Sequence, residues 1–116
     1  MRVLATMVVV SLLGGCAGRS IEGGTVLSPG SAARLDVRGR GAEILIRNGG
    51  SEPLGVEVGS GATPPVRDSI DPGVTRWWNP DGPRTYRLVN SSVRPLAVSY
   101  RVRGGGATFE PPADRP

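Results

Sequence analysis

Histidine is absent from this 116-residue chain, cysteine occurs once and methionine twice. Lysine is absent as well, so every basic side chain is an arginine. A serine or cysteine nucleophile therefore has neither an imidazole nor a lysine amine to act as its base. Zinc, copper, haem and iron-sulfur sites depend mainly on Cys, His and Met, so we expect no such metal and no cofactor.

Carboxylate pairs are the catalytic groups that this composition leaves. Glycosidases use two such side chains. The spacing of the acidic residues singles out no pair, and they lack the dense acidic loop of a calcium site. We therefore predict that the chain is not an enzyme and binds no metal, with a small carboxylate-dependent hydrolase as the alternative. The candidate carboxylates are Asp36, Glu43, Glu57, Asp68, Asp71 and Asp81.

The first fifteen residues have the organisation of a secretory signal. Met1 and Arg2 precede an apolar stretch over residues 3–13, and Gly14 and Gly15 follow it. A charged start, an apolar centre and a small-residue end are typical of a signal peptide. A helix over 3–13 would span only about 16 Å, half of the hydrocarbon core, so a transmembrane helix is the weaker interpretation.

The end of this segment, Leu13-Gly14-Gly15-Cys16, resembles the bacterial lipobox. In lipoproteins with this motif, an aliphatic and two small residues precede a cysteine that is diacylated before the signal is removed. The resemblance implies that residues 1–15 are a signal peptide and that Cys16 carries lipid. Ala17 stands where aspartate favours inner-membrane retention in enteric bacteria. The resemblance thus favours the periplasmic face of the outer membrane if the organism is Gram-negative.

An ordinary signal peptide is the alternative interpretation of the same residues. Cleavage after an A-x-A-like site would leave Cys16 as a free thiol, which is a liability in an oxidising compartment. Two or three acyl chains would instead anchor the protein stably to a membrane.

The remaining residues predict one small all-β domain. We expect a flexible tether over 16–24, a folded domain over 25–103 and a disordered tail over 104–116, because both flanks are rich in glycine or proline. No window has helical periodicity, and short β-branched segments recur every ~8–12 residues. The expected strands are 25–27, 33–38, 43–47, 54–58, 66–70, 74–78, 85–89 and 96–103.

An internal repeat relates the two halves of the domain. One half of a sandwich would leave its apolar face uncovered, so we expect the two copies to stack face to face. The predicted fold is a small immunoglobulin-like β-sandwich of about seven or eight strands, built from two similar halves. The repeated residues are Asn48, Pro53, Leu54 and Val56, which recur as Asn90, Pro95, Leu96 and Val98 at an offset of 90 − 48 = 42.

A turn signal lies between two of the expected strands. Asn79-Pro80-Asp81-Gly82 favours a type I turn, because proline suits the second position and glycine the fourth. We therefore expect segments 74–78 and 85–89 to pair as a hairpin.

Two groups of side chains are candidate contacts for a ligand or partner. Trp77 and Trp78 are consecutive strand residues, so one should face the core and the other the solvent. The outer ring could stack on a sugar, or it could cover its own hairpin. An outward arginine face could bind phosphate or an acidic polymer, or could protect a strand edge from pairing. The candidate arginines are Arg38, Arg87, Arg101 and Arg103.

These features predict a lipid-anchored bacterial envelope lipoprotein with a non-catalytic β-sandwich for binding or assembly. The expected partners are the membrane, through the lipid on Cys16, and another envelope protein or cell-wall glycan. Nucleic acid is not an expected partner, because the domain is exported and the net charge is only +4.

Overall fold

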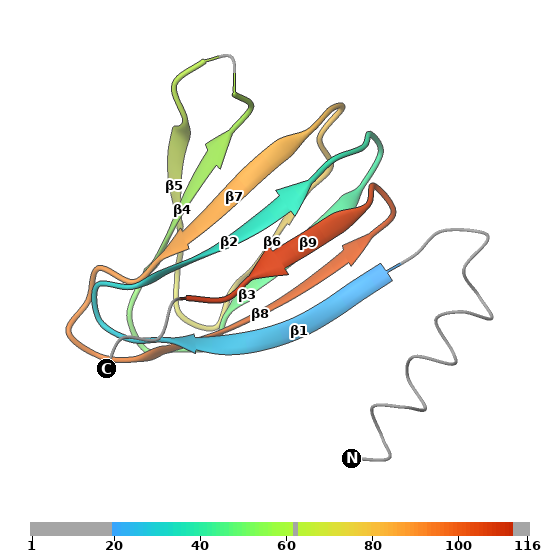
Figure 1. The fold of residues 1–116 in the computed structure, drawn as a ribbon. Coiled ribbons are helices and arrows are strands. Elements are labelled where there is room, and N and C mark those ends of the chain that lie inside the picture. The colour runs from blue at the N-terminus through green and yellow to red at the C-terminus, as the bar shows by residue number, and fades with distance from the viewer. Residues whose placement is uncertain (1–19, 62, 113–116) are drawn as a thin grey trace, which may run out of the picture.

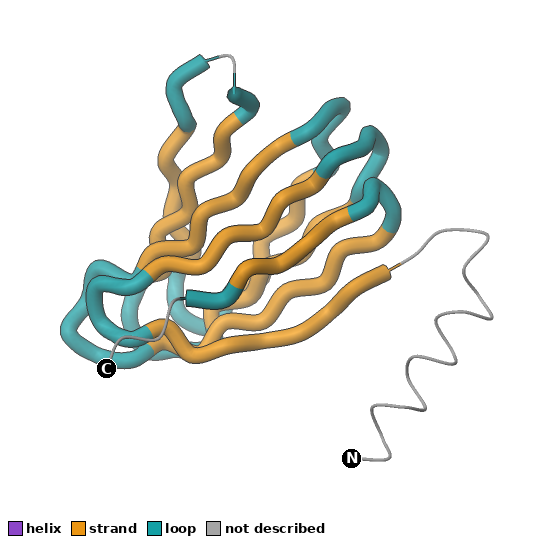
Figure 2. The backbone as a smooth tube through the Cα atoms, in the orientation of Figure 1, coloured by secondary structure: helices purple, strands orange, loops and turns teal. Residues whose placement is uncertain are grey.

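A computed structural model describes residues 20–61 and 63–112, and its regular elements are all β-strands (Figures 1 and 2). The all-β, two-sheet architecture expected from the sequence is confirmed. Neighbouring strands are antiparallel, in the order β1-β8-β3-β6 in a four-stranded sheet and β5-β4-β7-β2-β9 in a five-stranded sheet. The strands are β1 (Ser20–Leu27), β2 (Ala32–Val37), β3 (Glu43–Asn48), β4 (Leu54–Gly59), β5 (Val66–Ile70), β6 (Thr75–Trp78), β7 (Arg84–Val89), β8 (Leu96–Arg103) and β9 (Ala107–Glu110).

Consecutive strands mostly lie in opposite sheets. Among the described strands, β4 and β5 are the one pair of chain neighbours that hydrogen-bond to each other. Two four-stranded layers linked in this alternating way form a jelly roll, here extended by β9. The immunoglobulin-like arrangement predicted from the sequence is therefore wrong, because spacing and alternation locate strands without fixing the order in which they pair. No helix that could span a membrane occurs in the described residues.

The hairpin expected around Asn79 to Gly82 is not formed. β6 pairs with β3, whereas β7 pairs with β2 and β4. The segment 79–83 carries the chain from one sheet to the other, and the side-chain amide of Asn79 donates a 2.6 Å hydrogen bond to the carbonyl oxygen of Ala42. A turn signal specifies that the chain reverses, but not which sheet receives the next strand.

The sequence repeat corresponds to a structural repeat. When β1 to β4 are matched in order with β5 to β8, the order β1-β8-β3-β6 becomes β5-β4-β7-β2, which is the order of the other sheet without β9. The domain is therefore built from two similar halves, as predicted. Each half contributes two strands to each sheet, so the halves interleave and do not stack face to face as predicted. An apolar strand face requires a cover but does not specify which strands provide it.

Asn48, at the end of β3, is fully buried and joins two parts of the chain. Its Nδ2 atom donates hydrogen bonds to the carbonyl oxygens of Glu52 (2.7 Å) and Ile70 (2.8 Å). Its Oδ1 atom accepts a hydrogen bond from the backbone N–H of Gly50 at 2.9 Å. Asn48 therefore closes the β3–β4 loop and fastens it to the end of β5.

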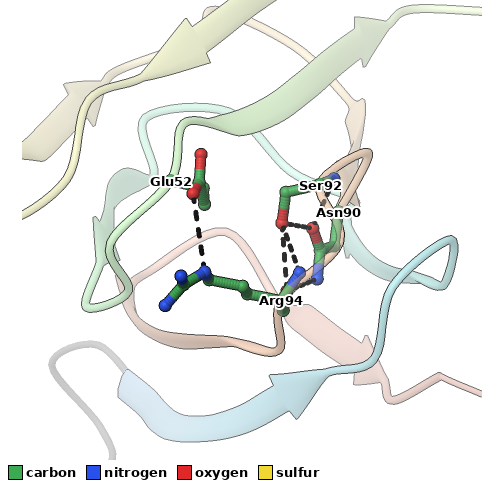
Figure 3. A network of polar contacts seen from close by, with 4 residues as sticks. All are labelled: Glu52, Asn90, Ser92 and Arg94. Carbon is green, nitrogen blue, oxygen red and sulfur yellow. Dashed lines mark hydrogen bonds and ion pairs between the residues drawn. The ribbon is translucent and has the colours of Figure 1, made fainter.

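Asn90 repeats this arrangement in the second half of the chain, where it is also fully buried. Its Nδ2 atom donates to the carbonyl oxygens of Arg94 (2.7 Å) and Leu27 (2.8 Å), and its Oδ1 atom accepts from the N–H of Ser92 (2.8 Å). Figure 3 shows the two loops meeting, with the Arg94 guanidinium 4.0 Å from the Glu52 carboxylate. The repeated asparagines thus hold equivalent loops at one end of the sandwich.

The core between the sheets is mainly aliphatic and is built from alternate residues of the strands. In β8, Leu96, Val98 and Val102 are buried, whereas Ala97 and Arg101 are exposed. The buried apolar residues are Leu27, Ala33, Leu35, Val37, Ala42, Ile44, Ile46, Leu54, Val56, Ile70, Tyr86, Leu88, Leu96, Val98 and Val102.

The flexible tether predicted over 16–24 is wrong over residues 20–24, which form the first part of β1. A β-carbon on Gly23 would lie 2.7 Å from the hydroxyl oxygen of Tyr100, and one on Gly24 would lie 3.0 Å from the carbonyl oxygen of Val98. Glycine here permits close packing of β1 and does not signal flexibility. The predicted signal peptide over 1–15 and Cys16 lie outside the described residues.

The disordered tail predicted over 104–116 is wrong over 107–110, which form β9 and pair with β2. Gly104, Gly105 and Gly106 have φ angles of 76°, 77° and 62°, values that glycine adopts without strain. They form the turn that returns the chain into the fold, where Phe109 stacks on Tyr100 with ring centroids 4.3 Å apart. Residues 113–116 lie outside the described part.

Replacing either buried asparagine should destabilise the domain strongly. Asn48→Ala and Asn90→Ala each leave buried carbonyl groups without a donor, so we expect a loss of about 3 kcal/mol in the free energy of unfolding. Asn79→Ala is the matched control, because it removes one amide with a single side-chain hydrogen bond. Urea unfolding of the three variants measures the difference. Equal losses for Asn79 and the buried pair would contradict the proposed role of the pair.

Candidate functional site

The outer face of the four-stranded sheet carries an exposed tryptophan. The strand register places Trp77 of β6 beside Leu45 of β3, and Leu45 beside Arg101 of β8. Arg101 in turn faces Glu22 of β1, and its Nε atom lies 3.1 Å from the Glu22 carboxylate. Trp77 is 58% exposed. We call these four cross-strand neighbours the Trp77 row.

A shallow depression of about 530 Å³ adjoins the Trp77 row. Gly24 and Ser99 face each other across β1 and β8 on this side of the sheet, and neither contributes a large side chain. The lining of the depression includes carboxylate, guanidinium and hydroxyl groups, and one lining residue, Leu45, is the cross-strand neighbour of the exposed Trp77. The depression is lined by Glu22, Gly23, Leu45, Arg47, Thr75, Ser99, Tyr100 and Arg101.

Trp78 faces the opposite way, as the sequence predicted for one of the two tryptophans. It is partly buried against the core, and its ring meets that of Tyr86 edge to face with centroids 5.4 Å apart. Burial raises the pKa of the Tyr86 hydroxyl to about 12. The guanidinium of Arg76 lies 5.2 Å from the centre of the Trp78 ring. Trp78 is thus a packing residue, and Trp77 is the one available to a ligand.

Asp68 and Arg76 form an ion pair at the edge of the sandwich between β5 and β6. Their strand neighbours, Val56 and Ile46, are buried, so both charged side chains lie on the inner faces of their sheets. Arg76 Nη2 lies 2.7 Å from Asp68 Oδ2. The hydrogen bond from Arg76, assisted by one from the N–H of Ser69, lowers the pKa of Asp68, and the Asp68 carboxylate raises the pKa of Arg76.

The ion pair makes Asp68 a poor candidate for a general acid, because its carboxyl group is held in the charged form. Four other candidate carboxylates also lie within 4.0 Å of an arginine. Among the described residues, no group of three or more acidic, His or Cys side chains could hold a metal ion. The arginine-paired carboxylates are Asp36, Glu43, Glu57, Asp68 and Asp81.

The single arginine face predicted from the sequence is not present. Arg101 and Arg103 lie on the four-stranded sheet, Arg87 lies on the five-stranded sheet, and Arg38 lies in the β2–β3 loop. Alternation fixes the face within one strand but not which strands share a sheet. The three strand arginines each have a carboxylate partner on a neighbouring strand: Arg87 with Glu57 (3.3 Å), Arg101 with Glu22 (3.1 Å) and Arg103 with Glu43 (3.8 Å).

Sequence reasoning did not select Leu45 or Glu22 as site residues. Leu45 could have been found, because Ile44-Leu45-Ile46 breaks the alternation of β3 and so requires one apolar side chain on the outer face. Glu22 had no such signal, since its place in the row depends on the pairing of β1 with β8, far apart in the sequence.

This geometry defines a small jelly-roll domain whose candidate ligand surface is the outer face of one sheet. No protein-family model matches the chain, and no curated protein matches it in sequence. A Klebsiella pneumoniae structure described as an uncharacterized conserved protein with a double-stranded β-helix domain is similar, with a TM-score of 0.58 and 18% identity, over 83% of this chain and 76% of that one.

Two larger proteins contain a similar fold. Peruvianin-I, a cysteine peptidase from Thevetia peruviana latex, has a TM-score of 0.56 and 18% identity, over 77% of this chain and 54% of its own. An oxalate oxidase has a TM-score of 0.55 and 17% identity, over 78% of this chain and 45% of its own. Identities this low show the fold alone, which is the double-stranded β-helix form of the jelly roll.

The Asp68–Arg76 pair should make a small, pH-dependent contribution to stability. The pKa of Asp68 is lowered in the folded state, so the contribution is present above its ordinary value of 3.8 and is lost as the pH falls through the folded value. We expect Asp68→Asn to cost less than about 1 kcal/mol near neutral pH, because the pair is exposed to solvent. Urea unfolding between about pH 7 and pH 2 should show the two proteins converging in acid.

Asp71→Asn is the matched control for this measurement, since Asp71 has no arginine partner among the described residues. A wild-type advantage over Asp68→Asn that persists unchanged at the lowest pH would contradict the ion-pair explanation.

Proposed function

We propose that this protein is a lipid-anchored lipoprotein of the bacterial envelope whose jelly-roll domain is a non-catalytic binding module. The observation that carries the binding role is the exposed Trp77 beside a depression whose lining combines apolar surface with polar side chains. Exposed tryptophan is unusual on a surface that has no partner, and an indole supplies a large contact area at low entropic cost. The pairing of the candidate carboxylates with arginines supports a non-catalytic role.

The anchor in this proposal is Cys16, for which the lipobox resemblance is the support. Strand β1 begins at Ser20, so three residues, 17–19, separate the cysteine from the folded domain. With lipid on Cys16, the domain would be held close to a membrane surface. Its ligand would then be a component of the envelope within reach of that surface.

Cell-wall glycan is the ligand class that the Trp77 row favours within this proposal. The apolar face of a sugar ring stacks on an aromatic side chain, while its hydroxyl groups need hydrogen-bonding partners at the sides. Trp77 and Leu45 provide the apolar surface, and Thr75, Ser99 and the Glu22 carboxylate provide polar groups. A protein of the envelope is the second candidate partner, because Trp77 is also suited to an interface.

Acylation of Cys16 is the first expectation to test. Expression of the full chain in a lipoprotein-processing bacterium should give a mature protein that begins at Cys16, carries lipid and sediments with membranes. Cys16→Ser should abolish the lipid and the membrane association while leaving the domain folded, because residue 16 precedes β1. Mass spectrometry of the amino-terminal peptide measures the modification. A mature protein with an unmodified Cys16 would contradict the anchoring proposal.

Glycan binding by the Trp77 row is tested separately. Trp77→Ala should weaken pull-down on purified peptidoglycan at least about tenfold, since it removes the aromatic anchor. Val93→Ala is the matched control, because Val93 is an exposed apolar residue at the opposite end of the sandwich, 86% exposed. Unchanged thermal unfolding would show that Trp77→Ala folds normally. If peptidoglycan retained Trp77→Ala and Val93→Ala equally well, glycan would be excluded as the ligand of this row. The anchoring proposal would not be affected.

A further inference from the structure

The loops of the sandwich gather at two opposite ends (Figure 1). One end includes the start of β1 and is called the Ser20 end. The other is called the far end and contains the two asparagine-closed loops. The Ser20 end consists of loops 38–42, 60–65, 79–83 and 104–106, with residue 62 outside the described part, and the far end consists of loops 28–31, 49–53, 71–74 and 90–95.

The β2–β3 loop is fixed next to the start of β1 by backbone contacts. Ser20 faces Arg103, the last residue of β8, in the strand register. The turn that follows Arg103 accepts two hydrogen bonds from the β2–β3 loop. The N–H of Arg38 donates to the carbonyl oxygen of Gly106 (3.1 Å), and the N–H of Gly39 donates to that of Gly105 (2.7 Å). Arg38 and Arg40 are therefore held at the end where the chain enters the domain.

Arg38 and Arg40 differ from most other arginines of the domain. Both are exposed, and neither lies within 4.0 Å of a carboxylate among the described residues. Arg47 also lacks a carboxylate there, but it donates to the Gly73 carbonyl oxygen at 3.0 Å. The eight other described arginines each have an acidic partner: Arg34, Arg67, Arg76, Arg84, Arg87, Arg94, Arg101 and Arg103.

The two ends of the sandwich consequently differ in charge. The loops of the Ser20 end contain Arg38, Arg40 and Asp81, which gives 2 − 1 = +1. The loops of the far end contain one arginine and two acidic residues, which gives 1 − 2 = −1. The far-end residues are Glu52, Asp71 and Arg94. The excess positive charge thus lies where the chain would leave for its anchor.

We propose that the Ser20 end faces the bilayer and that Arg38 and Arg40 bind the phosphates of anionic phospholipid headgroups. This inference rests on the proposed acylation of Cys16, which lies four positions before Ser20 in the chain, a reach of at most about 14 Å. Guanidinium groups bind phosphate through paired hydrogen bonds. The short connection makes the contact intramolecular with the anchor, so two individually weak contacts are enough to orient the domain.

Vesicle binding without the acyl chains isolates the arginine contribution. The chain from residue 16 onward with Cys16→Ser retains every described residue. Sedimentation with vesicles of phosphatidylcholine and phosphatidylglycerol at low salt measures the partition coefficient. Arg38→Gln with Arg40→Gln should reduce it about thirtyfold, which corresponds to roughly fivefold for each arginine at an anionic surface. Pure phosphatidylcholine vesicles should bind the parent protein no better than they bind the variant.

The matched control is Arg34→Gln with Arg94→Gln, which removes the same charge nearer the far end, because Arg34 is the third residue of β2 after loop 28–31 and Arg94 lies in loop 90–95. It should lower the partition coefficient less than threefold, because neither residue would face the lipid. Equal losses for the two double variants would show attraction by net charge alone and would overturn the inference. An unchanged partition coefficient for the Arg38 and Arg40 variant would overturn it as well.

The outcome for the arginines can be separated from the outcome for the anchor. Selective loss of vesicle binding together with an unmodified Cys16 in cells would retain the headgroup site and reject the anchor. Acylated Cys16 together with unaltered vesicle binding by the arginine variant would retain the anchor and reject the headgroup site.

Discussion

The hydrogen bonds of two buried side-chain amides, Asn48 and Asn90, fix the end of the sandwich at which both sheets are tied together. Each amide closes its own loop and holds the end of a strand from a distant part of the chain, β5 for Asn48 and β1 for Asn90. The backbone carbonyl groups of the same residues accept 2.8 Å hydrogen bonds from Gly73 and Gly30, respectively. Because a buried amide must satisfy all its hydrogen-bonding groups, the arrangement tolerates little displacement of either loop. The far end is therefore held by side-chain as well as backbone hydrogen bonds.

Ion pairs, many of them between neighbouring strands, involve most of the charged side chains of the described residues. On the five-stranded sheet, the register sets Glu57 between Arg67 and Arg87, and Arg34 beside Glu110. Exposed pairs of this kind contribute little stability each, but charged edges oppose sheet-to-sheet aggregation. The pairs also occupy the guanidinium groups that could otherwise bind anions. The exposed Trp77 and the loop with Arg38 and Arg40 depart from this pattern, and for this reason we assign to them contacts outside the domain.

Strand positions could be predicted closely from the sequence, whereas the limits of the domain could not. Segments 66–70 and 96–103 coincide with β5 and β8, because β-branched and apolar residues mark them and glycine or proline bounds them. The two glycine-rich flanks were misassigned as flexible because composition alone does not distinguish glycine that permits motion from glycine that permits close approach. Gly23 lies under Tyr100, and Gly105 would place a β-carbon 2.6 Å from that of Ala42. Those contacts join residues far apart in the sequence and leave no local signal.

The sequence by itself determined the all-β class, the alternation of side chains along the strands, and the duplication that places Asn48 and Asn90 in equivalent positions. It determined these features because they depend on local alternation and on repetition along the chain. Only the tertiary structure decided that consecutive strands alternate between sheets, that the halves interleave, and that Trp77 rather than Trp78 faces outward. It also separated the predicted arginines onto different surfaces. Each of these outcomes depends on which strands pair, and strand pairing is set by contacts between distant residues.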